Sequence, residues 1–161
     1  MTLISRIASY NKDFENIVYI RKLCGWHHDK VKHWFLLQEK GYRIQWIFEL
    51  DKNVVGMIAL DLEDDDKTVA SKKDGIACIT SLFILPDYRG KGYAKLFNKY
   101  VEKYVKENLN EIKTLTMHTR SDNIISYNMY KELDYIEYKR DNRYPESDVP
   151  AVFFRKNIGN Y

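Results

Sequence analysis

The sequence predicts a mixed α/β domain in which strands and helices alternate along the chain. Runs rich in β-branched and aromatic residues recur at the length of strands, and amphipathic stretches of helical period lie between them. Glycine and proline separate many of these segments. Because 161 residues is the size of one domain with room for a hydrophobic core, we predict a single domain over residues 1–161.

The expected elements follow the order β-α-α-β-β-β-α-β-α-β-β. Strands are expected at residues 3–8, 43–50, 54–62, 76–85, 112–119, 135–139 and 152–156, and helices at 14–23, 29–40, 95–106 and 122–133. Side chains that accept hydrogen bonds from free helical amides are the usual N-caps. We expect Asn11 or Asp13 to cap the first helix and Asp29 the second. Ser121 or Asp122 is expected to cap the fourth.

The composition limits the class of protein. Hydrophobic residues make up 45% and charged residues 30% of the chain, and the net charge of +3 is too small to indicate a nucleic-acid-binding protein by itself. No apolar run approaches the length of a membrane span, and the first residues lack a signal-peptide core, so we expect a cytoplasmic protein. Cys24 and Cys78 are then expected to be free thiols.

The most informative stretch runs from Ile76 to Tyr104. Its first part, up to Leu85, suits a central strand, which Pro86 ends because proline cannot donate to a ladder. The sequence Arg-Gly-Lys-Gly-Tyr-Ala follows at 89–94, and then a helix with an apolar face. Glycines at a helix N-terminus let a phosphate approach free backbone amides, so this stretch is predicted to bind a pyrophosphate.

Two common phosphate-binding motifs do not fit this turn. A P-loop ends in Gly-Lys-Ser or Gly-Lys-Thr, and the dinucleotide-binding fingerprint has a third glycine where this chain has Lys95. The order Leu-Phe-Ile-Leu-Pro at 82–86, then Arg89, Gly92 and Ala94, then a helix, resembles the acyl-CoA-binding motif of the GCN5-related N-acetyltransferase (GNAT) family. The alternative, a plain strand-to-helix connection, explains the glycines but not the whole order.

A second stretch is also similar to that family. The sequence Asn-Ile-Ile-Ser-Tyr-Asn-Met-Tyr at 123–130 resembles the second family motif, with matches in place or by type at its asparagine, serine, methionine and final tyrosine. The chain departs from the motif at Asp134, where glycine is usual, but aspartate tolerates left-handed helix-end geometry better than most residues. The resemblance implies a central, mostly antiparallel twisted sheet flanked by helices.

The resemblance implies that the chain binds acetyl-CoA as its cosubstrate. In the family, backbone amides of the strand before the turn bind the pantetheine and the thioester carbonyl, and the glycine turn binds the pyrophosphate. The corresponding residues here are Leu82, Phe83, Ile84, Leu85, Arg89, Gly90, Lys91, Gly92, Tyr93, Ala94 and Lys95, with Asn123 expected to meet the CoA arm.

Acetyl transfer requires a neutral amine and a proton for the leaving thiolate. Tyr130 matches the tyrosine that acts as general acid in many family members. His118, five residues before Asn123, is the predicted base, because N-terminal acetyltransferases of the family use Glu or His at that spacing and imidazole titrates near neutral pH. The alternatives are a structural histidine and proton loss through water. Alternation along the strand places His118 away from the apolar Leu115 and Met117.

The acceptor is predicted to be a primary amine, either on a small metabolite or at a protein or peptide N-terminus. The segment around Tyr144 resembles a tyrosine-bearing loop of N-terminal acetyltransferases, and the loop around Trp26 is expected to form the opposite wall. The competing hypothesis is a non-catalytic acyl-CoA-binding member of the same fold. We expect a monomer or homodimer that binds neither nucleic acid nor membrane.

Two clusters of possible metal ligands lack the spacing of a metal site, so no metal is expected. His27, His28 and His33 lack further ligands at set spacing, and the acids of residues 61–66 lack the glycine and closing glutamate of a calcium loop. We expect both segments to be solvated loops, although the acids could also attract a cationic substrate. The core is expected to contain the aromatic residues Trp34, Phe35, Trp46 and Phe48.

Overall fold

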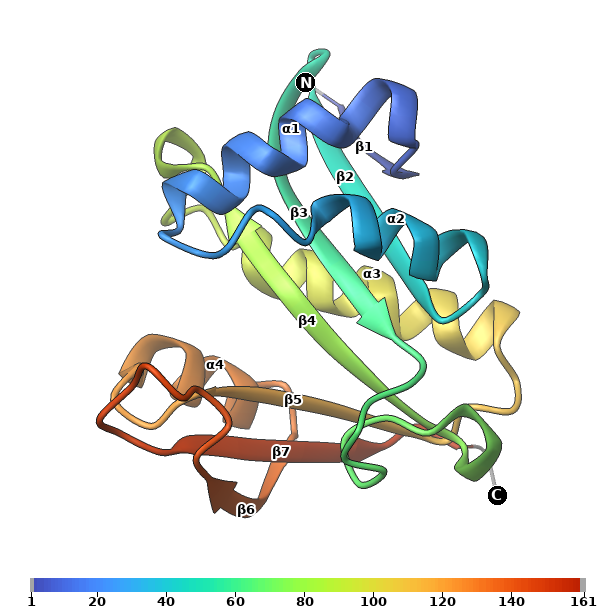
Figure 1. The fold of residues 1–161 in the computed structure, drawn as a ribbon, viewed down its shortest axis with the longest axis vertical. Coiled ribbons are helices and arrows are strands. Elements are labelled where there is room, and N and C mark those ends of the chain that lie inside the picture. The colour runs from blue at the N-terminus through green and yellow to red at the C-terminus, as the bar shows by residue number, and fades with distance from the viewer. Residues whose placement is uncertain (1, 160–161) are drawn as a thin grey trace. The chain divides into compact units, whose positions relative to one another are not determined.

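The structure, a computed structural model, describes residues 2–159, so Met1, Asn160 and Tyr161 of the predicted domain lie outside it. The elements follow the predicted order (Figure 1). The strands are β1 (Leu3–Ile7), β2 (Arg43–Leu50), β3 (Asn53–Asp61), β4 (Ile76–Ile84), β5 (Thr114–Arg120), β6 (Ile136–Asp141) and β7 (Ala151–Asn157). The α-helices are α1 (Tyr10–Leu23), α2 (Val31–Glu39), α3 (Tyr93–Asn108) and α4 (Ile124–Glu132), and the 3-10 helices are Lys72–Asp74 and Pro86–Tyr88.

The seven strands follow the hydrogen-bonded order β1-β2-β3-β4-β5-β7-β6. The pairs β1/β2, β2/β3, β5/β7 and β6/β7 are antiparallel and β4/β5 is parallel, so the predicted mostly antiparallel sheet is confirmed. The chain divides into two compact units, and β4 and α3 each contribute residues to both. Unit 1 contains the residues up to Leu62 and Thr80–Asn98, and unit 2 contains Glu63–Ile79 and the residues from Lys99 onward.

In unit 1, both faces of the sheet are covered by helix. Helices α1 and α2 lie over one face of β1–β3 (Figure 1). On the opposite face, the ring of Phe48 on β2 stacks on Phe97 of α3, with 3.5 Å between ring centroids. Such an aromatic pair adds roughly 0.5–1.5 kcal/mol beyond its burial. The cluster under α1 and α2 contains Ile17, Ile20, Val31, Phe35, Ile47, Met57 and Phe83.

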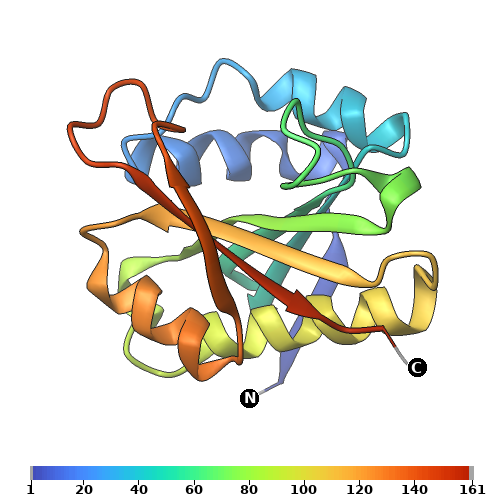
Figure 2. The same ribbon diagram turned by 90° about the horizontal axis from the view of Figure 1, so that it is seen from below.

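In unit 2, helix α4 lies against one face of β5 and β7 (Figure 2). The rings of Tyr127 and Tyr130 meet Phe154 edge-on, at centroid distances of 5.3 and 5.5 Å. On the other face, Phe153 packs in a buried cluster with Val69, Ala70, Cys78 and Ala151. The alternation of Phe153 and Phe154 therefore gives β7 an apolar side chain for each face.

The expected core aromatics are confirmed in part. Trp46 and Phe48 are fully buried and Phe35 nearly so, whereas Trp34 is only half-buried. Cys24 and Cys78 are both free, as predicted. Among residues 2–159, no helix is long and apolar enough to cross a membrane.

The first two helices begin at residues other than those predicted. Helix α1 starts at Tyr10 with Ser9 as N-cap, so neither Asn11 nor Asp13 caps it. Asp13 instead reaches back, because its carboxylate accepts from the Ser9 amide at 2.9 Å and from the Arg6 guanidinium at 2.6 and 2.8 Å. Helix α2 starts at Val31 after Lys30, and Asp29 lies in the preceding turn rather than at the cap.

Helix α4 also has a different cap from the one predicted. Asn123 caps it, its Oδ1 accepting from the Ser126 amide at 3.2 Å, instead of Ser121 or Asp122. Asp122 is engaged elsewhere, since its carboxylate pairs with the Arg120 guanidinium at 2.9 Å. The helix exits through Asp134 with a φ of 69°, the left-handed geometry expected where the family motif has glycine.

In unit 1, the turn between β2 and β3 and the close approach of β3 to β4 both depend on the backbone conformation of single residues. The hairpin between β2 and β3 turns through Asp51 and Lys52, whose φ values of 50° and 68° fit a turn that matches the twist of the strands. Further along β3, a Cβ added to Gly56 would lie 2.2 Å from the Phe83 carbonyl oxygen. Glycine therefore permits the close approach of β3 and β4 just before the predicted cosubstrate turn.

Candidate functional site

In unit 1, the backbone of β4 is irregular at Ser81, immediately before the predicted cosubstrate-binding residues. Ser81 has a φ of 52°, a left-handed conformation that costs of order 1–3 kcal/mol for a residue other than glycine. The buried Arg43 holds it in place. Its Nη2 donates to the Ser81 hydroxyl at 2.9 Å, and its Nη1 donates to Asp61 at 2.6 Å. A charged hydrogen-bond network therefore fixes the point where β4 departs from regular strand geometry.

Beyond Ser81, the amides of residues 82–85 point alternately toward and away from β3. The Leu85 amide donates to the Val55 carbonyl of β3 at 2.8 Å, so it is already used within the sheet. By alternation, the Phe83 amide points the same way. The amides of Leu82 and Ile84 point to the other edge and are the members of the predicted set that can donate to a bound molecule.

The glycine turn forms as predicted. Gly90 and Gly92 have φ values of 75° and 83°, and helix α3 begins at Tyr93. The Leu96 amide bonds back to the turn, to the Gly92 carbonyl at 3.2 Å. The N-terminal end of the helix carries partial positive charge, which favours an anion. The space above both glycines is open, because a Cβ added at either would meet no atom within 4 Å.

Two cations flank this turn. The Arg89 Nε donates to the Ile84 carbonyl at 2.9 Å, and its guanidinium lies 5.0 Å over the ring of Phe83. The Lys91 ammonium lies 5.7 Å from the ring of Tyr88. Arg89 is thus tied to the strand that precedes the turn, while its remaining N–H groups are left to bind a phosphate. Lys95 stands exposed in the first turn of α3.

Trp26, predicted to line the acceptor site, lies in the loop between α1 and α2. Its indole contacts Phe83 edge-on at 6.1 Å, so the acceptor-side loop of unit 1 touches the strand with the predicted cosubstrate amides. The neighbouring His27, His28 and His33 are exposed, in agreement with a solvated segment. Among residues 2–159, no group of three or more His, Cys, Asp or Glu side chains is placed to hold a metal ion.

In unit 2, the structure brings His118 and Tyr144 together. The Nδ1 of His118 and the hydroxyl of Tyr144 lie 2.6 Å apart, and the two ring centroids are 5.7 Å apart. His118 lies on β5 and Tyr144 in the loop between β6 and β7. On its other side, His118 contacts the ring of Phe153 at 5.5 Å. Two residues singled out separately in the sequence, one as base and one as acceptor wall, therefore form a hydrogen-bonded pair.

The surroundings of His118 make it a weak base. Burial, with a smaller contribution from the charges of Arg143 and Lys139, lowers its pKa from 6.5 to about 3, against the opposing effect of Asp64. Burial likewise raises the pKa of Tyr144 well above its usual value. At neutral pH the pair is therefore a neutral imidazole beside a neutral phenol. This differs from the sequence-based expectation of an imidazole that titrates near neutral pH.

The acidic segment before β4 is not simply solvated, contrary to expectation. Asp64 forms a bidentate ion pair with Arg143, at 3.0 and 2.6 Å, and Asp66 pairs with Lys139. Burial raises the pKa of Asp64, but the hydrogen bonds from Arg143 outweigh it and the net pKa is lowered. The hydrogen bond from Lys139 lowers the pKa of Asp66 to about 2. These acids thus hold the loop that carries Tyr144, and their charges are balanced within unit 2.

Tyr130, the predicted general acid, lies on α4 with its side chain 8% exposed. Burial raises the pKa of its hydroxyl well above the usual value, so the group keeps its proton throughout the neutral range. That property suits a proton donor. Asn123, the expected CoA contact, is at the start of the same helix, where its side-chain oxygen already caps the helix.

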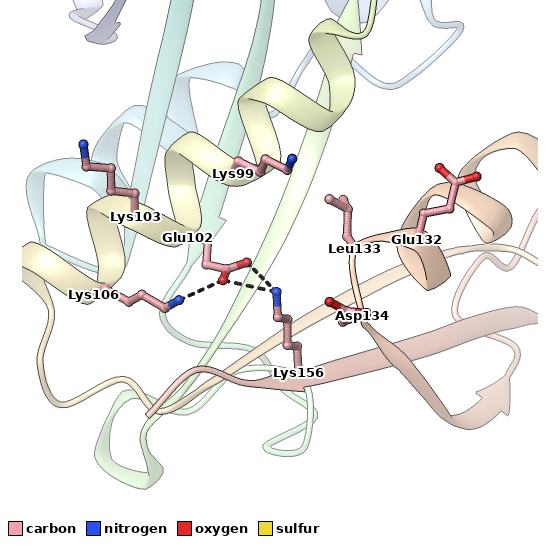
Figure 3. Close-up of a pocket in the computed structure, with 8 residues that line it drawn as sticks. All are labelled: Lys99, Glu102, Lys103, Lys106, Glu132, Leu133, Asp134 and Lys156. Atoms are coloured by element: carbon pink, nitrogen blue, oxygen red, sulfur yellow. Dashed lines mark hydrogen bonds and ion pairs between the residues drawn. The ribbon is translucent and has the colours of Figure 1, made fainter. Parts of the chain in front are cut away.

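A basic groove of about 480 Å³ also lies in unit 2, and Figure 3 shows its lining. Glu102 sits at its centre and accepts from Lys106 at 3.0 Å and from Lys156 at 3.1 Å. Its walls come from α3, the end of α4 and β7. The lining contains none of the predicted catalytic or cosubstrate-binding residues, so we treat it as a surface groove held by ion pairs.

Sequence reasoning missed the residues that support the site. Arg43 and Asp61 fix Ser81, and Asp64 and Arg143 fix the Tyr144 loop. The burial of Arg43 could not be predicted from the sequence, because nothing in the local pattern marks this first residue of a strand as buried. The acidic run at 61–66 was visible, but Lys139 on β6 and Arg143 in the loop after it, the partners of Asp66 and Asp64, lie more than 70 positions away, and no local pattern connects them.

The comparisons with known proteins agree with this geometry. The sequence model of the acetyltransferase (GNAT) family matches residues 9–135. An N-acetyltransferase from Staphylococcus aureus Mu50 has a similar structure, with a TM-score of 0.80 and 14% identity over 98% of this chain and 99% of that one. The spermidine N-acetyltransferase of Vibrio cholerae in complex with CoA and spermine is also similar, with a TM-score of 0.77 and 15% identity over 96% of this chain and 95% of that one.

A dodecameric structure of the same Vibrio cholerae spermidine N-acetyltransferase gives a TM-score of 0.79 and 14% identity over 97% of this chain and 94% of that one. At such identities the structural likeness shows the fold alone. No curated protein sequence matches the chain. The family match, by contrast, spans well over half of the 161 residues. The chain therefore belongs to the acetyltransferase (GNAT) family.

Proposed function

We propose that the protein transfers the acetyl group of acetyl-CoA to a primary amine by direct attack of the amine on the thioester. The carbon–sulfur bond breaks, an amide bond forms, the amine loses a proton and the CoA thiolate gains one. The observation that carries the proposal is the turn of unit 1, where two left-handed glycines open the N-terminus of α3 to an anion. Family membership supports acetyl-CoA as the molecule that supplies this anion.

The roles in cosubstrate binding follow from the geometry of β4 and of the glycine turn. The amides of Leu82 and Ile84 bind the pantetheine arm and the thioester carbonyl. The glycine turn at residues 90–92, the N-terminal end of α3 and the Arg89 guanidinium bind the pyrophosphate. Because the pyrophosphate is ionised, the hydrogen bonds from both the amides and Arg89 are charge-assisted and about twice as strong as neutral ones.

In the chemical step, Tyr130 donates its proton to the leaving thiolate. Because burial raises the pKa of Tyr130, its hydroxyl still carries the proton when the thiolate forms, and the tyrosine regains a proton from water after the transfer. His118 acts as a neutral hydrogen-bonding partner of the incoming amine or of a water molecule, with Tyr144 fixing its orientation. Because the pKa of His118 is about 3, the amine proton passes to water rather than resting on this imidazole.

The two cysteines support direct attack over a cysteine-bound acetyl intermediate. Burial raises the pKa of Cys24 to about 12, so its reactive thiolate is scarce at neutral pH. Cys78 is buried in the cluster around Phe153. A thiol that is buried in apolar surroundings is a poor nucleophile.

The proposal is tested with a panel of primary amines, amino acids and N-terminal peptides. Each is incubated with the purified protein and acetyl-CoA, while thiol release and the mass of the acetylated product are followed. We expect at least one acceptor to be acetylated with thiol release in equal amount. Tight binding of acetyl-CoA without transfer to any acceptor would instead favour a non-catalytic acyl-CoA-binding protein.

A further inference from the structure

Arg21, at the end of α1, lies against two indole rings. Its guanidinium carbon is 4.8 Å from the ring of Trp26 and 4.1 Å from the ring of Trp34. Its Nε donates to the His27 carbonyl at 2.8 Å. The stacked rings and this hydrogen bond fix the plane of the guanidinium, and its two terminal Nη groups are the donors that remain for a further partner.

Within the part of the chain that the structure describes, no carboxylate forms an ion pair with this arginine, whereas the neighbouring Arg43 is neutralised by Asp61 at 2.6 Å. Burial, and after it the charge of Arg43, lowers the pKa of Arg21 to about 10, against smaller opposing effects of Cys24 and Asp29, so it remains charged at neutral pH. Half-buried arginines normally pair with a carboxylate or phosphate, because an uncompensated charge is costly to remove from water.

The position of Arg21 connects it to the predicted cosubstrate strand. Trp26, one of its two stacking partners, contacts Phe83 at 6.1 Å, and Arg89 lies over the same Phe83 at 5.0 Å. Arg21, Trp26, Phe83 and Arg89 thus form a continuous row within unit 1, with a cation at each end and two rings between them. One end of the row is Arg89, the predicted pyrophosphate ligand, and the other is Arg21, which forms no ion pair with a carboxylate of residues 2–159.

We propose that Arg21 binds a carboxylate of the acceptor, so that the enzyme acetylates amines that also carry a carboxylate group, such as amino acids or short acidic amines. This inference rests on the proposed function and narrows its acceptor. A guanidinium whose plane is fixed presents its two terminal nitrogens to both oxygens of a carboxylate. A polycationic amine such as spermidine has no carboxylate to bind Arg21, and its positive charges are repelled by the guanidinium.

The competing explanation is that Arg21 only holds the loop between α1 and α2 through its stacking contacts. Such a structural role is indifferent to the chemistry of the acceptor. The two explanations are separated by pairs of acceptors that differ only in the carboxylate. Suitable pairs are L-lysine and cadaverine, L-phenylalanine and phenethylamine, and L-methionine and its decarboxylated amine.

The first measurement compares kcat/KM within each pair for the wild-type protein. We expect the carboxylate-bearing member of the accepted pair to be favoured by about 10- to 100-fold, the range for charge-assisted hydrogen bonds. Arg21→Met should remove that preference, because it should raise the KM of the carboxylate-bearing member far more than the KM of the decarboxylated one. Lys22→Met removes a charge from the neighbouring exposed residue and serves as the matched control, with the preference intact.

A second measurement does not depend on turnover. Isothermal titration calorimetry compares the binding of N-acetyl amino acids with that of the matching N-acetylated amines, in the presence of CoA. Tighter binding of the carboxylate member, lost in Arg21→Met and kept in Lys22→Met, supports the site even if no acceptor is turned over. Equal binding of both members to the wild-type protein overturns it. Transfer to amines without any carboxylate preference overturns this inference and leaves the proposed function standing.

Discussion

At the scale of single residues, the pKa values of Tyr130 and His118 are shifted in opposite directions, and both shifts keep the side chain neutral. Burial raises the pKa of the phenol and lowers the pKa of the imidazole, so both are neutral at physiological pH. A neutral phenol carries a proton that it can donate, whereas a neutral imidazole of low pKa is a weak base and does not hold an added proton at neutral pH. The two residues therefore differ in what their substitution should do.

Substitution of Tyr130 by phenylalanine should affect chemistry more than cosubstrate binding. We expect kcat to fall by roughly 10- to 10³-fold, the lower range for losing a general acid, with the acetyl-CoA Kd unchanged. Steady-state kinetics with a calorimetric Kd measures both. Tyr127→Phe is the control, because Tyr127 contacts the same Phe154 from the same helix but is not assigned to the reaction. An equal loss in both variants would remove Tyr130 from the mechanism.

The protonation of His118 is measurable without substrate. Because its pKa is lowered to about 3, the proton that distinguishes imidazolium from imidazole should be absent from pH 8 down to pH 5. Nitrogen-15 NMR of the imidazole rings follows this, with His118→Gln to assign the signal. Tyr144→Phe should change the balance of the two neutral tautomers, since it removes the partner of Nδ1 at 2.6 Å. Protonation of His118 near pH 6.5 would restore it as the base.

At the scale of elements, the turn before α3 contributes through backbone geometry. Gly92→Ala should raise the acetyl-CoA Kd, because a side chain blocks the approach of the pyrophosphate and φ of 83° is strained for alanine. Gly41→Ala is a matched control with a φ of 81° and equally open space, at the end of α2. Both variants should lose roughly 1–2 kcal/mol of stability. A Kd raised equally in both would mean that strain, not phosphate contact, is responsible.

The ion pair between Asp64 and Arg143 fixes the loop that carries Tyr144. Because the folded pKa of Asp64 is lowered, its stabilisation is complete above its unfolded pKa of about 3.9 and is lost as pH falls further. Asp64→Asn should therefore cost about 1–3 kcal/mol at pH 7 and much less near pH 2, measured by urea unfolding. Glu63→Gln, which breaks an exposed pair with Lys67, should cost under about 1 kcal/mol. A pH-independent loss in Asp64→Asn would contradict this assignment.

At the scale of the whole molecule, local patterns were sufficient for the elements. Alternation and helical period predicted every strand and α-helix, and Gly90-Lys91-Gly92 predicted the turn before α3, because each signal lies within a few residues. The helix starts were less predictable. Asp13 accepts hydrogen bonds from the Ser9 amide and from Arg6, and Asp122 forms an ion pair with Arg120. Both aspartates are therefore positioned by an arginine that lies outside the helix.

The environment of the site was beyond sequence reasoning for the same reason. The pKa of His118 depends on burial and on Arg143, and the strained Ser81 depends on Arg43, which lies 38 positions away in the chain. Such contacts arise only when strands pair. The sequence could therefore suggest candidate catalytic residues, but not the protonation states on which their proposed roles depend.

The central claim is direct acetyl transfer from acetyl-CoA to an amine. Its most direct test is intact-protein mass spectrometry together with CoA release, with and without an acceptor found in the amine panel. We predict that CoA is released only when the amine is present, in equal amount to the acetylated amine, and that the protein carries no acetyl group at any time. Release of CoA without amine, accompanied by an acetylated protein that then passes its acetyl group to the amine, would contradict the account.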